Sequence, residues 1–119
     1  MLSYRHGFHA GNQADVLKHT VLIFCLDYLA QKSKPFRYID THAGAGSYLL
    51  DEGFAAQNRD WAQGISLLMP DTGMLPAMVS RYIEVIRTFQ TPEAHGAAFY
   101  PGSPLIAAAL LRPGDQGCC

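Results

Sequence analysis

The sequence has too few of several features to belong to some broad classes of protein. Its three cysteines, Cys25, Cys118 and Cys119, show no CxxC or Cys/His spacing, so they predict neither a disulfide framework nor a metal site. The longest apolar run, Val21 to Leu26, is far too short to span a bilayer. Residues 1–15 are polar, which argues against a secretory signal peptide. We therefore expect a cytoplasmic protein with no membrane partner.

An excess of charge of either sign is also missing. The chain has 9 Lys/Arg against 10 Asp/Glu, so the total favours no class of partner. The distribution is uneven. Residues 1–37 hold five Lys/Arg and two Asp/Glu, whereas the remainder of the chain holds four Lys/Arg and eight Asp/Glu. The basic first third is the better candidate for binding a polyanion. From charge alone we favour a solvated, mildly basic surface.

Helical periodicity is present in three stretches. Residues 14–31 carry an apolar stripe preceded by Asn12 as a plausible N-cap, and residues 77–89 carry a second stripe. Ser103 and Pro104 suit the N-cap and first position of a third helix over 105–112. The first stripe consists of Leu17, Val21, Phe24 and Tyr28, and it is widened by Leu22, Cys25 and Leu29. This spacing predicts that the residues of the stripe are buried and that Lys18 and His19 lie on its flank.

Only one convincing β-strand is found, over Phe36 to Ile39. A parallel partner would follow a crossover helix, and residues 104–112 are typical of one. Residues 113–119 lack the β-branched residues of a second strand. We therefore expect the partner strands to come from another chain or from the rest of a longer protein.

A glycine-rich turn follows this strand directly and reads Asp40-Thr41-His42-Ala43-Gly44-Ala45-Gly46. Open α/β sheets bind ligands at the carboxyl ends of their strands, and glycine lets the backbone approach a ligand closely. The turn lacks the third glycine of the dinucleotide fingerprint, since Leu49 stands there, and the Lys-Ser/Thr of a P-loop. The pattern indicates a nucleotide-type cofactor, with a tight turn that binds no ligand as the alternative.

Four further residues are candidates for binding. His42 lies inside the glycine-rich turn, where core packing is an unlikely role, so we expect it to hydrogen-bond a ligand. Ser103 offers a hydroxyl where a helix starts, either as a cap or as an anion site. Tyr4 and His6 place an aromatic ring beside a basic group, which suits base stacking. From these residues alone we favour the simpler interpretation, a tail that becomes ordered only on binding.

Three blocks of the chain together resemble one protein family. MLSYRHGFHAGNQADVLKHT, KPFRYIDTHAGAGSY and YPGSPLIAAALLR are similar to the bacterial 23S ribosomal RNA adenine-N6 methyltransferases of the large subunit, in the family's order. The resemblance implies a Rossmann-like class I fold with a helical insert, of which this chain would be the N-terminal portion. It also implies S-adenosylmethionine as cofactor, protein-free 23S ribosomal RNA as partner, and a monomer.

The resemblance also assigns roles to residues. It places the cofactor motif at Asp40, Gly44 and Gly46, with His19, His42 and Ser103 as further cofactor contacts. It assigns Tyr4, His6 and Lys18 to the substrate side of the active site. It divides the chain into an N-terminal tail (1–13), the start of the methyltransferase domain (14–50), a helical insert (51–98), the continuation of the domain (99–112) and a tail unlike the family (113–119).

The family that the sequence resembles has a catalytic Asp-Pro-Pro-Tyr motif, and this motif does not occur in these 119 residues. We therefore expect a truncated methyltransferase that is inactive by itself. One alternative is a non-catalytic remnant that binds S-adenosylmethionine or RNA. Another is a dinucleotide-dependent oxidoreductase, which leaves the Tyr4–His19 block without an explanation.

Overall fold

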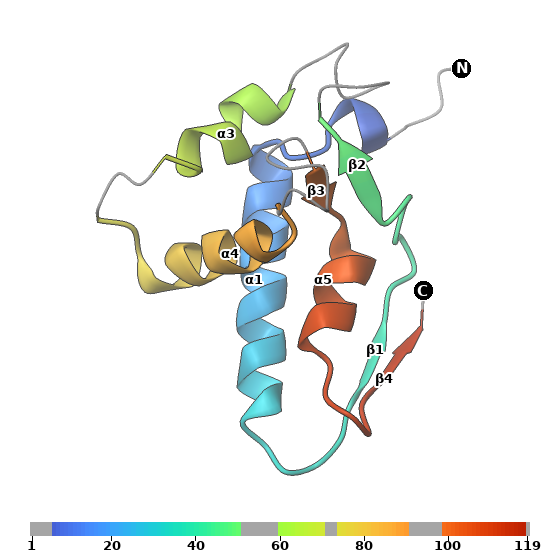
Figure 1. The fold of residues 1–119 in the computed structure, drawn as a ribbon. Helices are drawn as coiled ribbons and strands as arrows, with labels where there is room; N and C mark the ends of the chain where they lie inside the picture. Colours follow the sequence, from blue (N-terminus) through green and yellow to red (C-terminus); the bar gives the residue numbers. More distant parts are fainter. Residues whose placement is uncertain (1–5, 51–59, 71–73, 91–98, 119) are drawn as a thin grey trace.

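A computed structural model describes residues 6–50, 60–70, 74–90 and 99–118 and shows a mixed α/β arrangement (Figure 1). Four α-helices, two short 3₁₀ helices and four three-residue strands are found in these ranges. In chain order they are η1 (His6–Phe8), α1 (Gln13–Ala30), β1 (Arg37–Ile39), β2 (Ser47–Leu49), η2 (Asp60–Gln63), α3 (Ile65–Leu68), α4 (Ala77–Thr88), β3 (Phe99–Pro101), α5 (Ser103–Leu110) and β4 (Gln116–Cys118).

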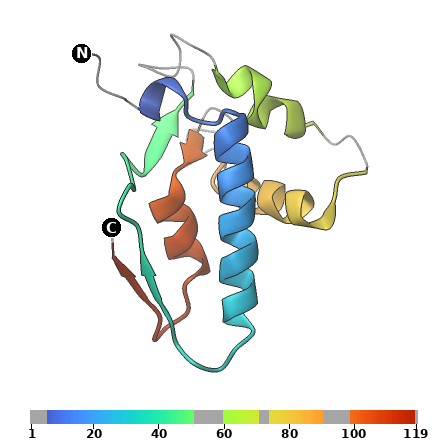
Figure 2. The same cartoon turned by 180° about the vertical axis from the view of Figure 1, so that it is seen from behind.

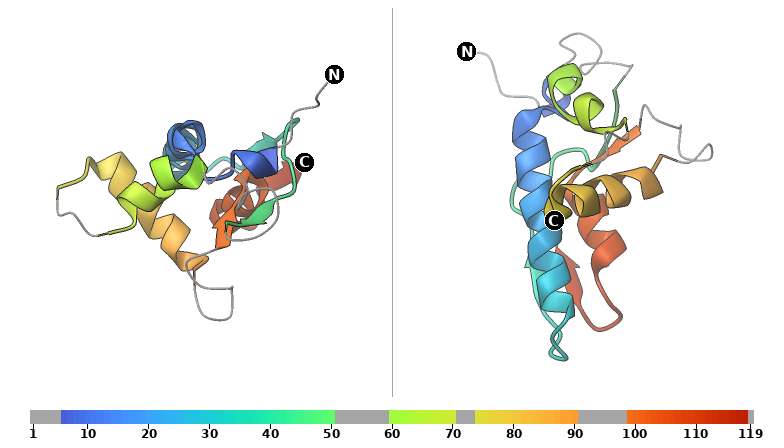
Figure 3. Two further views of the ribbon diagram at one scale, coloured as in Figure 1. Left: turned by 90° about the horizontal axis from the view of Figure 1, so that it is seen from above. Right: turned by 90° about the vertical axis from the view of Figure 1, so that its left-hand side faces the viewer.

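Helix α1 is the central element, and α4 and α5 both pack against it. Seen along α1, α4 lies on one side, and η1, β1 and β2 lie on the other (Figure 3). The helix begins as predicted at Asn12, whose side chain accepts a hydrogen bond from the Asp15 N–H at 2.9 Å. At its other end the Arg112 guanidinium donates to the carbonyls of Ala30 and Lys32, which satisfies acceptors that a helix C-terminus leaves open.

The buried face of α1 differs from the predicted stripe. Leu17 is 68% exposed, and Val21, Phe24, Cys25 and Tyr28 are exposed as well. The helix is apolar on nearly every side, so periodicity alone does not choose the face that packs. The buried residues are Asp15, His19, Thr20, Ile23 and Leu26. Two of these are polar residues with partners elsewhere in the fold, so a face chosen by apolarity misses them.

The hydrophobic core lies where α1, α4, α5 and β3 meet. Ile23, Tyr82, Ile86, Tyr100 and Ile106 are essentially inaccessible to solvent there. Helix α4 follows its predicted range and buries the face expected from its spacing. This core fixes the position of α1, which carries several residues of the candidate site.

The strands form two separate pairs (Figure 2). β1 pairs in parallel with β4, with Arg37 opposite Gln116 and Ile39 opposite Cys118, and β2 pairs antiparallel with β3. The predicted strand at β1 is therefore confirmed, whereas the expectation that residues 113–119 form no strand is wrong. α5 supplies the crossover, and the pairing is extended by the Phe36 N–H, which donates to Asp115 at 3.0 Å.

Gly64 separates η2 from α3, and a Cβ at this position would lie 2.1 Å from the Gly11 carbonyl oxygen. In the ranges that are described, no helix is both long and apolar enough to cross a membrane.

Candidate functional site

A pocket of about 470 Å³ opens where the chain leaves β1. This volume falls within the ordinary range for small-molecule sites. Three segments that are far apart in the sequence line it. They contribute His6, Ala14, Asp15, Lys18 and His19 from the N-terminal part, His42, Ala43, Gly44 and Tyr48 from the turn after β1, and Gly102 and Ser103 from the start of α5.

The structure brings together most of the residues selected from the sequence. Those that line the pocket are His6, Lys18, His19, His42, Gly44 and Ser103. Asp40 does not line the pocket but accepts a hydrogen bond from Ser103, which does. Gly46 contacts Gly102 at the start of α5, and Tyr4 lies outside the described residues.

The glycine-rich turn is fastened to α5 through its backbone. Gly44 and Gly46 have φ values of 67° and 85°, which side chains rarely allow. The Gly46 carbonyl accepts from the Gly102 N–H at 2.7 Å, and a Cβ at Gly102 would lie 3.0 Å from that oxygen. A Cβ on Gly44 would lie 2.7 Å from the Tyr48 hydroxyl. Glycine at these positions therefore allows the turn and the helix start to form one wall of the pocket.

Asp40 is held by three donors at the end of β1. Its carboxylate accepts from Ser103 Oγ at 2.5 Å, from the Tyr38 hydroxyl at 2.6 Å and from the His42 N–H at 3.0 Å. Partial burial raises the pKa of Asp40, but these hydrogen bonds outweigh it and leave the pKa below its ordinary value. Asp40 is therefore ionised near neutral pH.

Ser103 takes a different position from the one predicted. Gly102 is the N-cap of α5, and Ser103 is the first residue of the helix. The hydroxyl of Ser103 is directed to Asp40 instead of the helix backbone. The bond joins the end of β1 to the start of α5, so the two elements place one polar cluster beside the pocket.

His42 and Lys18 are the accessible polar side chains at the pocket. His42 is exposed, and its Nδ1 lies 2.8 Å from the Thr41 hydroxyl oxygen. Lys18 is exposed on α1 and contributes to lowering the pKa of Asp40 through its positive charge. Lys18 therefore places an accessible positive charge at the pocket, on the side formed by α1.

His19 is buried, in contrast to the flanking position predicted for it. Its exposed fraction is 2%, and its Nδ1 lies 2.7 Å from the Tyr100 hydroxyl. Burial lowers the pKa of His19 to about 4, although the negative charge of Asp15 opposes part of this effect. The ring is therefore neutral at physiological pH.

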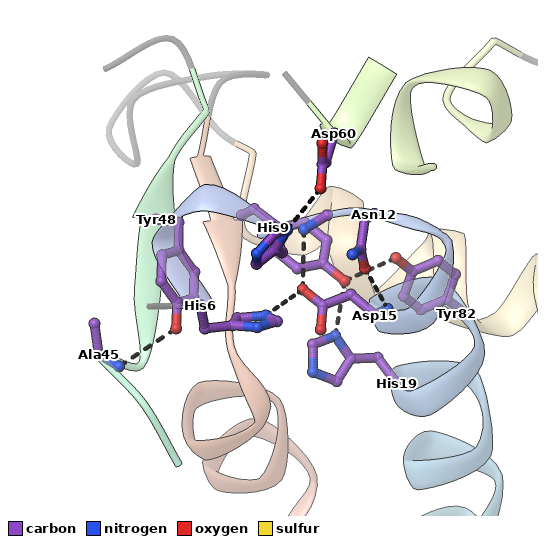
Figure 4. Close-up of polar contacts among 11 residues, drawn as sticks. His6, His9, Asn12, Asp15, His19, Ala45, Tyr48, Asp60 and Tyr82 are labelled. Atoms are coloured by element: carbon purple, nitrogen blue, oxygen red, sulfur yellow. Dashed lines mark hydrogen bonds and ion pairs between the residues drawn. The ribbon is translucent and has the colours of Figure 1, made fainter. Parts of the chain in front are cut away.

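Asp15 is a pocket residue that the sequence analysis missed. It is 1% exposed and accepts hydrogen bonds from the Gly11 N–H at 2.9 Å and from His6 Nε2 at 2.7 Å (Figure 4). Burial raises the pKa of Asp15, but the bond from His6 and the nearby charges outweigh it, so the pKa is lowered. An acidic residue in the first turn of a helix is too common to reveal such a role.

A second histidine anchors the same N-terminal segment. His9 Nδ1 lies 2.8 Å from the Asp60 carboxylate on η2 (Figure 4). With the bond between His6 and Asp15, this contact joins the segment around η1 to both α1 and η2. The segment that carries His6 is thereby placed against the pocket.

One family model matches most of the chain. The family model described as ribosomal RNA large subunit methyltransferase D, RlmJ, matches residues 33–118, which is more than half of the chain. The chain belongs to this family. The RlmJ match extends through β4 and so includes residues 113–118, which we expected to differ from the family.

Two named relatives cover almost the whole chain. Ribosomal RNA large subunit methyltransferase J of Escherichia coli (strain K12) is 49% identical over 116 residues, which are 98% of this chain and 40% of the relative. The protein of the same name from Haemophilus influenzae is 45% identical over 116 residues, 98% of this chain and 41% of the relative. The chain thus spans about 40% of the length of the curated RlmJ relatives it matches.

A solved structure supports the fold. Protein LPL1258 from Legionella pneumophila superposes with a TM-score of 0.79 at 38% sequence identity, covering 93% of this chain and 40% of that protein. The arrangement of helices and short strands is therefore one that an experimentally determined protein also adopts.

Proposed function

We propose that the pocket after β1 binds S-adenosylmethionine and that the protein serves the N6-methylation of an adenine in 23S ribosomal RNA. The observation that carries the proposal is the convergence of residues 6–19, 42–48 and 102–103 on one pocket at the carboxyl end of β1. The names of the relatives, which specify a large-subunit ribosomal RNA methyltransferase, support the class of reaction. The corresponding fold is Rossmann-like and class I, with residues 51–98 as a helical insert.

The residues present fit this cofactor chemically. S-adenosylmethionine carries a sulfonium and an ammonium group, and Asp40 offers an ionised carboxylate close to the pocket. The turn at Gly44 and Gly46 exposes backbone rather than side chains, which allows close approach of a ligand. His19 is neutral, so it does not repel the positive cofactor. We propose that these groups, with His42 and Ser103, bind and orient the cofactor.

The RNA side of the proposal rests on the N-terminal segment. Lys18 is accessible at the pocket and suits a contact with a phosphate oxygen, while His6 lines the same pocket, held by Asp15. An adenine has to leave its stack before its amine reaches a methyl donor. We propose that His6 and Lys18 form the side of the pocket that receives the base; Tyr4, to which the resemblance gives the same role, lies outside the described residues.

The chain's own residues account for binding and not for the whole reaction. Bound S-adenosylmethionine supplies an activated methyl group, so positioning contributes much of the rate of transfer. The Asp-Pro-Pro-Tyr motif that the resemblance assigns to the acceptor amine does not occur in the sequence. We therefore propose cofactor binding for these 119 residues and expect them to transfer no methyl group to 23S RNA by themselves.

Isothermal titration of the chain with S-adenosylmethionine tests the proposal. We expect saturable binding that Asp40→Asn weakens about 10-fold, because the negative charge close to the pocket is lost and with it the charged acceptor that holds Ser103. S-adenosylhomocysteine, which lacks the sulfonium charge, should be less sensitive to this substitution. Glu84→Gln is the matched control, since Glu84 is exposed on α4 and distant from the pocket residues. Absence of saturable binding, or equal affinity in Asp40→Asn, contradicts the proposal.

A further inference from the structure

Three buried polar side chains from three elements form a chain of hydrogen bonds that ends at the pocket. The Tyr82 hydroxyl on α4 lies 2.9 Å from the Tyr100 hydroxyl on β3, which lies 2.7 Å from Nδ1 of His19 on α1. Both tyrosines are 0% exposed and His19 is 2% exposed, so water does not compete for these bonds. Only His19 of the three lines the pocket.

The protons in this chain have one arrangement that gives every buried hydroxyl proton an acceptor. A neutral imidazole carries one N–H and one nitrogen lone pair, and each phenol carries one proton. If Tyr82 donates to Tyr100 and Tyr100 donates to His19 Nδ1, every hydroxyl proton has an acceptor. If Nδ1 carries the proton instead, one hydroxyl proton has no acceptor among the described residues. A buried donor without an acceptor is unfavourable, so the first arrangement is preferred.

We infer that Tyr100 is a positioning residue that holds His19 in the tautomer with its proton on Nε2, so that His19 offers a hydrogen-bond donor to the pocket. Tyr82 supports this role by donating to the oxygen of Tyr100. Figure 4 draws one dashed line from the His19 ring, and the second ring nitrogen points away from it; the bonded nitrogen is Nδ1, whose partner is Tyr100. This inference rests on the proposed function for the identity of the ligand, but the tautomer itself does not depend on a ligand.

The ionisation of both groups agrees with this assignment. Burial lowers the pKa of His19 to about 4, so the ring keeps a lone pair on Nδ1 at neutral pH. Burial also raises the pKa of Tyr100 well above its ordinary value, so its hydroxyl keeps the proton that it donates. Neither group has to change its charge for the chain of hydrogen bonds to form.

The assignment limits which ligand group can lie against His19. A neutral Nε2–H requires an acceptor with a lone pair, such as a carboxylate, a hydroxyl or a ring nitrogen. An ammonium group offers only donors and would leave both partners unsatisfied there. Within S-adenosylmethionine, the inference therefore places an acceptor oxygen or nitrogen at His19 and directs the ammonium elsewhere.

The tautomer is measured directly by a long-range proton–nitrogen NMR correlation of isotope-labelled histidine rings in the 119-residue chain. We expect the His19 pattern of a neutral ring with the proton on Nε2. In Tyr100→Phe, where Nδ1 loses its donor, we expect a mixture of the two tautomers and S-adenosylmethionine binding that is about 5- to 10-fold weaker. Tyr82→Phe removes a buried hydroxyl from the same chain of bonds but leaves the donor to Nδ1, so it should keep the tautomer.

Each outcome decides one part of the account. A proton on Nδ1 in the unsubstituted chain overturns the inference, and so does a Tyr100→Phe variant with unchanged tautomer and unchanged affinity. If Tyr100→Phe does not fold, the spectra of the unsubstituted chain and of Tyr82→Phe still decide the tautomer. If Nε2 carries the proton and no S-adenosylmethionine binds, the tautomer assignment holds and the proposed function fails.

Discussion

Single residues define the pocket mainly through charges and hydrogen bonds that the fold shields from water. Asp40 and Asp15 remain ionised in spite of burial because each accepts hydrogen bonds from side chains and from the backbone. Their donors come from elsewhere in the fold, with Ser103 bonding Asp40 and His6 bonding Asp15. Removing such a donor leaves a partly or fully buried carboxylate with fewer hydrogen bonds, which costs more free energy than the bond itself contributes.

The burial of His19 predicts how stability depends on pH. The ordinary pKa of 6.5 falls to about 4 in the folded chain, so between these values the unfolded chain binds a proton that the folded chain does not. The free energy of unfolding should therefore decrease as pH falls from about 6.5 to about 4, by about 3 kcal/mol at most. Urea unfolding at a series of pH values measures this decrease.

Two substitutions separate His19 from the other titrating groups. His19→Gln should flatten the dependence between pH 6.5 and 4, whereas His42→Gln, at an exposed position, should preserve it. The lowered pKa of Asp15 contributes stability that is present above about pH 4 and is lost only at still lower pH. A slope that His19→Gln leaves unchanged would contradict the burial of the imidazole.

Sequence patterns indicate some of these residues and miss others for a physical reason. His42, Gly44 and Gly46 are recognisable because they lie within one short turn. His19 is selected only through the resemblance, since beside Lys18 it has the pattern of a solvated helix face. The roles of Tyr82 and Tyr100 are missed, because they depend on contacts between residues that are far apart in the sequence. Tyr82 and Tyr100 are 18 positions apart, and Tyr100 and His19 on α1 are 81 positions apart.

At the level of elements, helices follow local sequence better than the short strands do. The range of α4 and the cap at Asn12 are predictable, because spacing and capping chemistry lie within a few residues. Strands of three residues have little pattern of their own, and β4 exists because its backbone pairs with β1 across most of the chain. A Gln-Gly-Cys segment has no β-branched residue that would indicate this.

The corrected orientation of α1 predicts different effects for substitutions of two aliphatic residues of this helix. Ile23 is 1% exposed in the core, and Leu17 is 68% exposed on the predicted stripe. Ile23→Ala should lower the free energy of unfolding by about 3 kcal/mol, and Leu17→Ala should change it by less than about 0.5 kcal/mol. Urea denaturation followed by circular dichroism measures both. The reverse ranking would show that the predicted stripe is the buried face after all.

At the level of the whole molecule, one pocket collects residues from nearly the full length of the described chain. His6 and Ser103 line it from opposite ends of the sequence, and the β1–α5–β4 unit holds the turn between them. The chain achieves this with about 40% of the length of its RlmJ relatives. One side of the proposed cofactor site is therefore built from three segments that lie far apart in the sequence.

An NMR titration of the chain with S-adenosylmethionine tests this central claim most directly. If the three segments form one cofactor pocket, the backbone amide signals of His19, Gly44, Gly46 and Ser103 shift together along one saturable binding curve. The amide of Glu84, on the far side of α1, should stay in place. Shifts confined to one of the three segments, or no saturable shift in any of them, would contradict the claim that they form a single cofactor pocket.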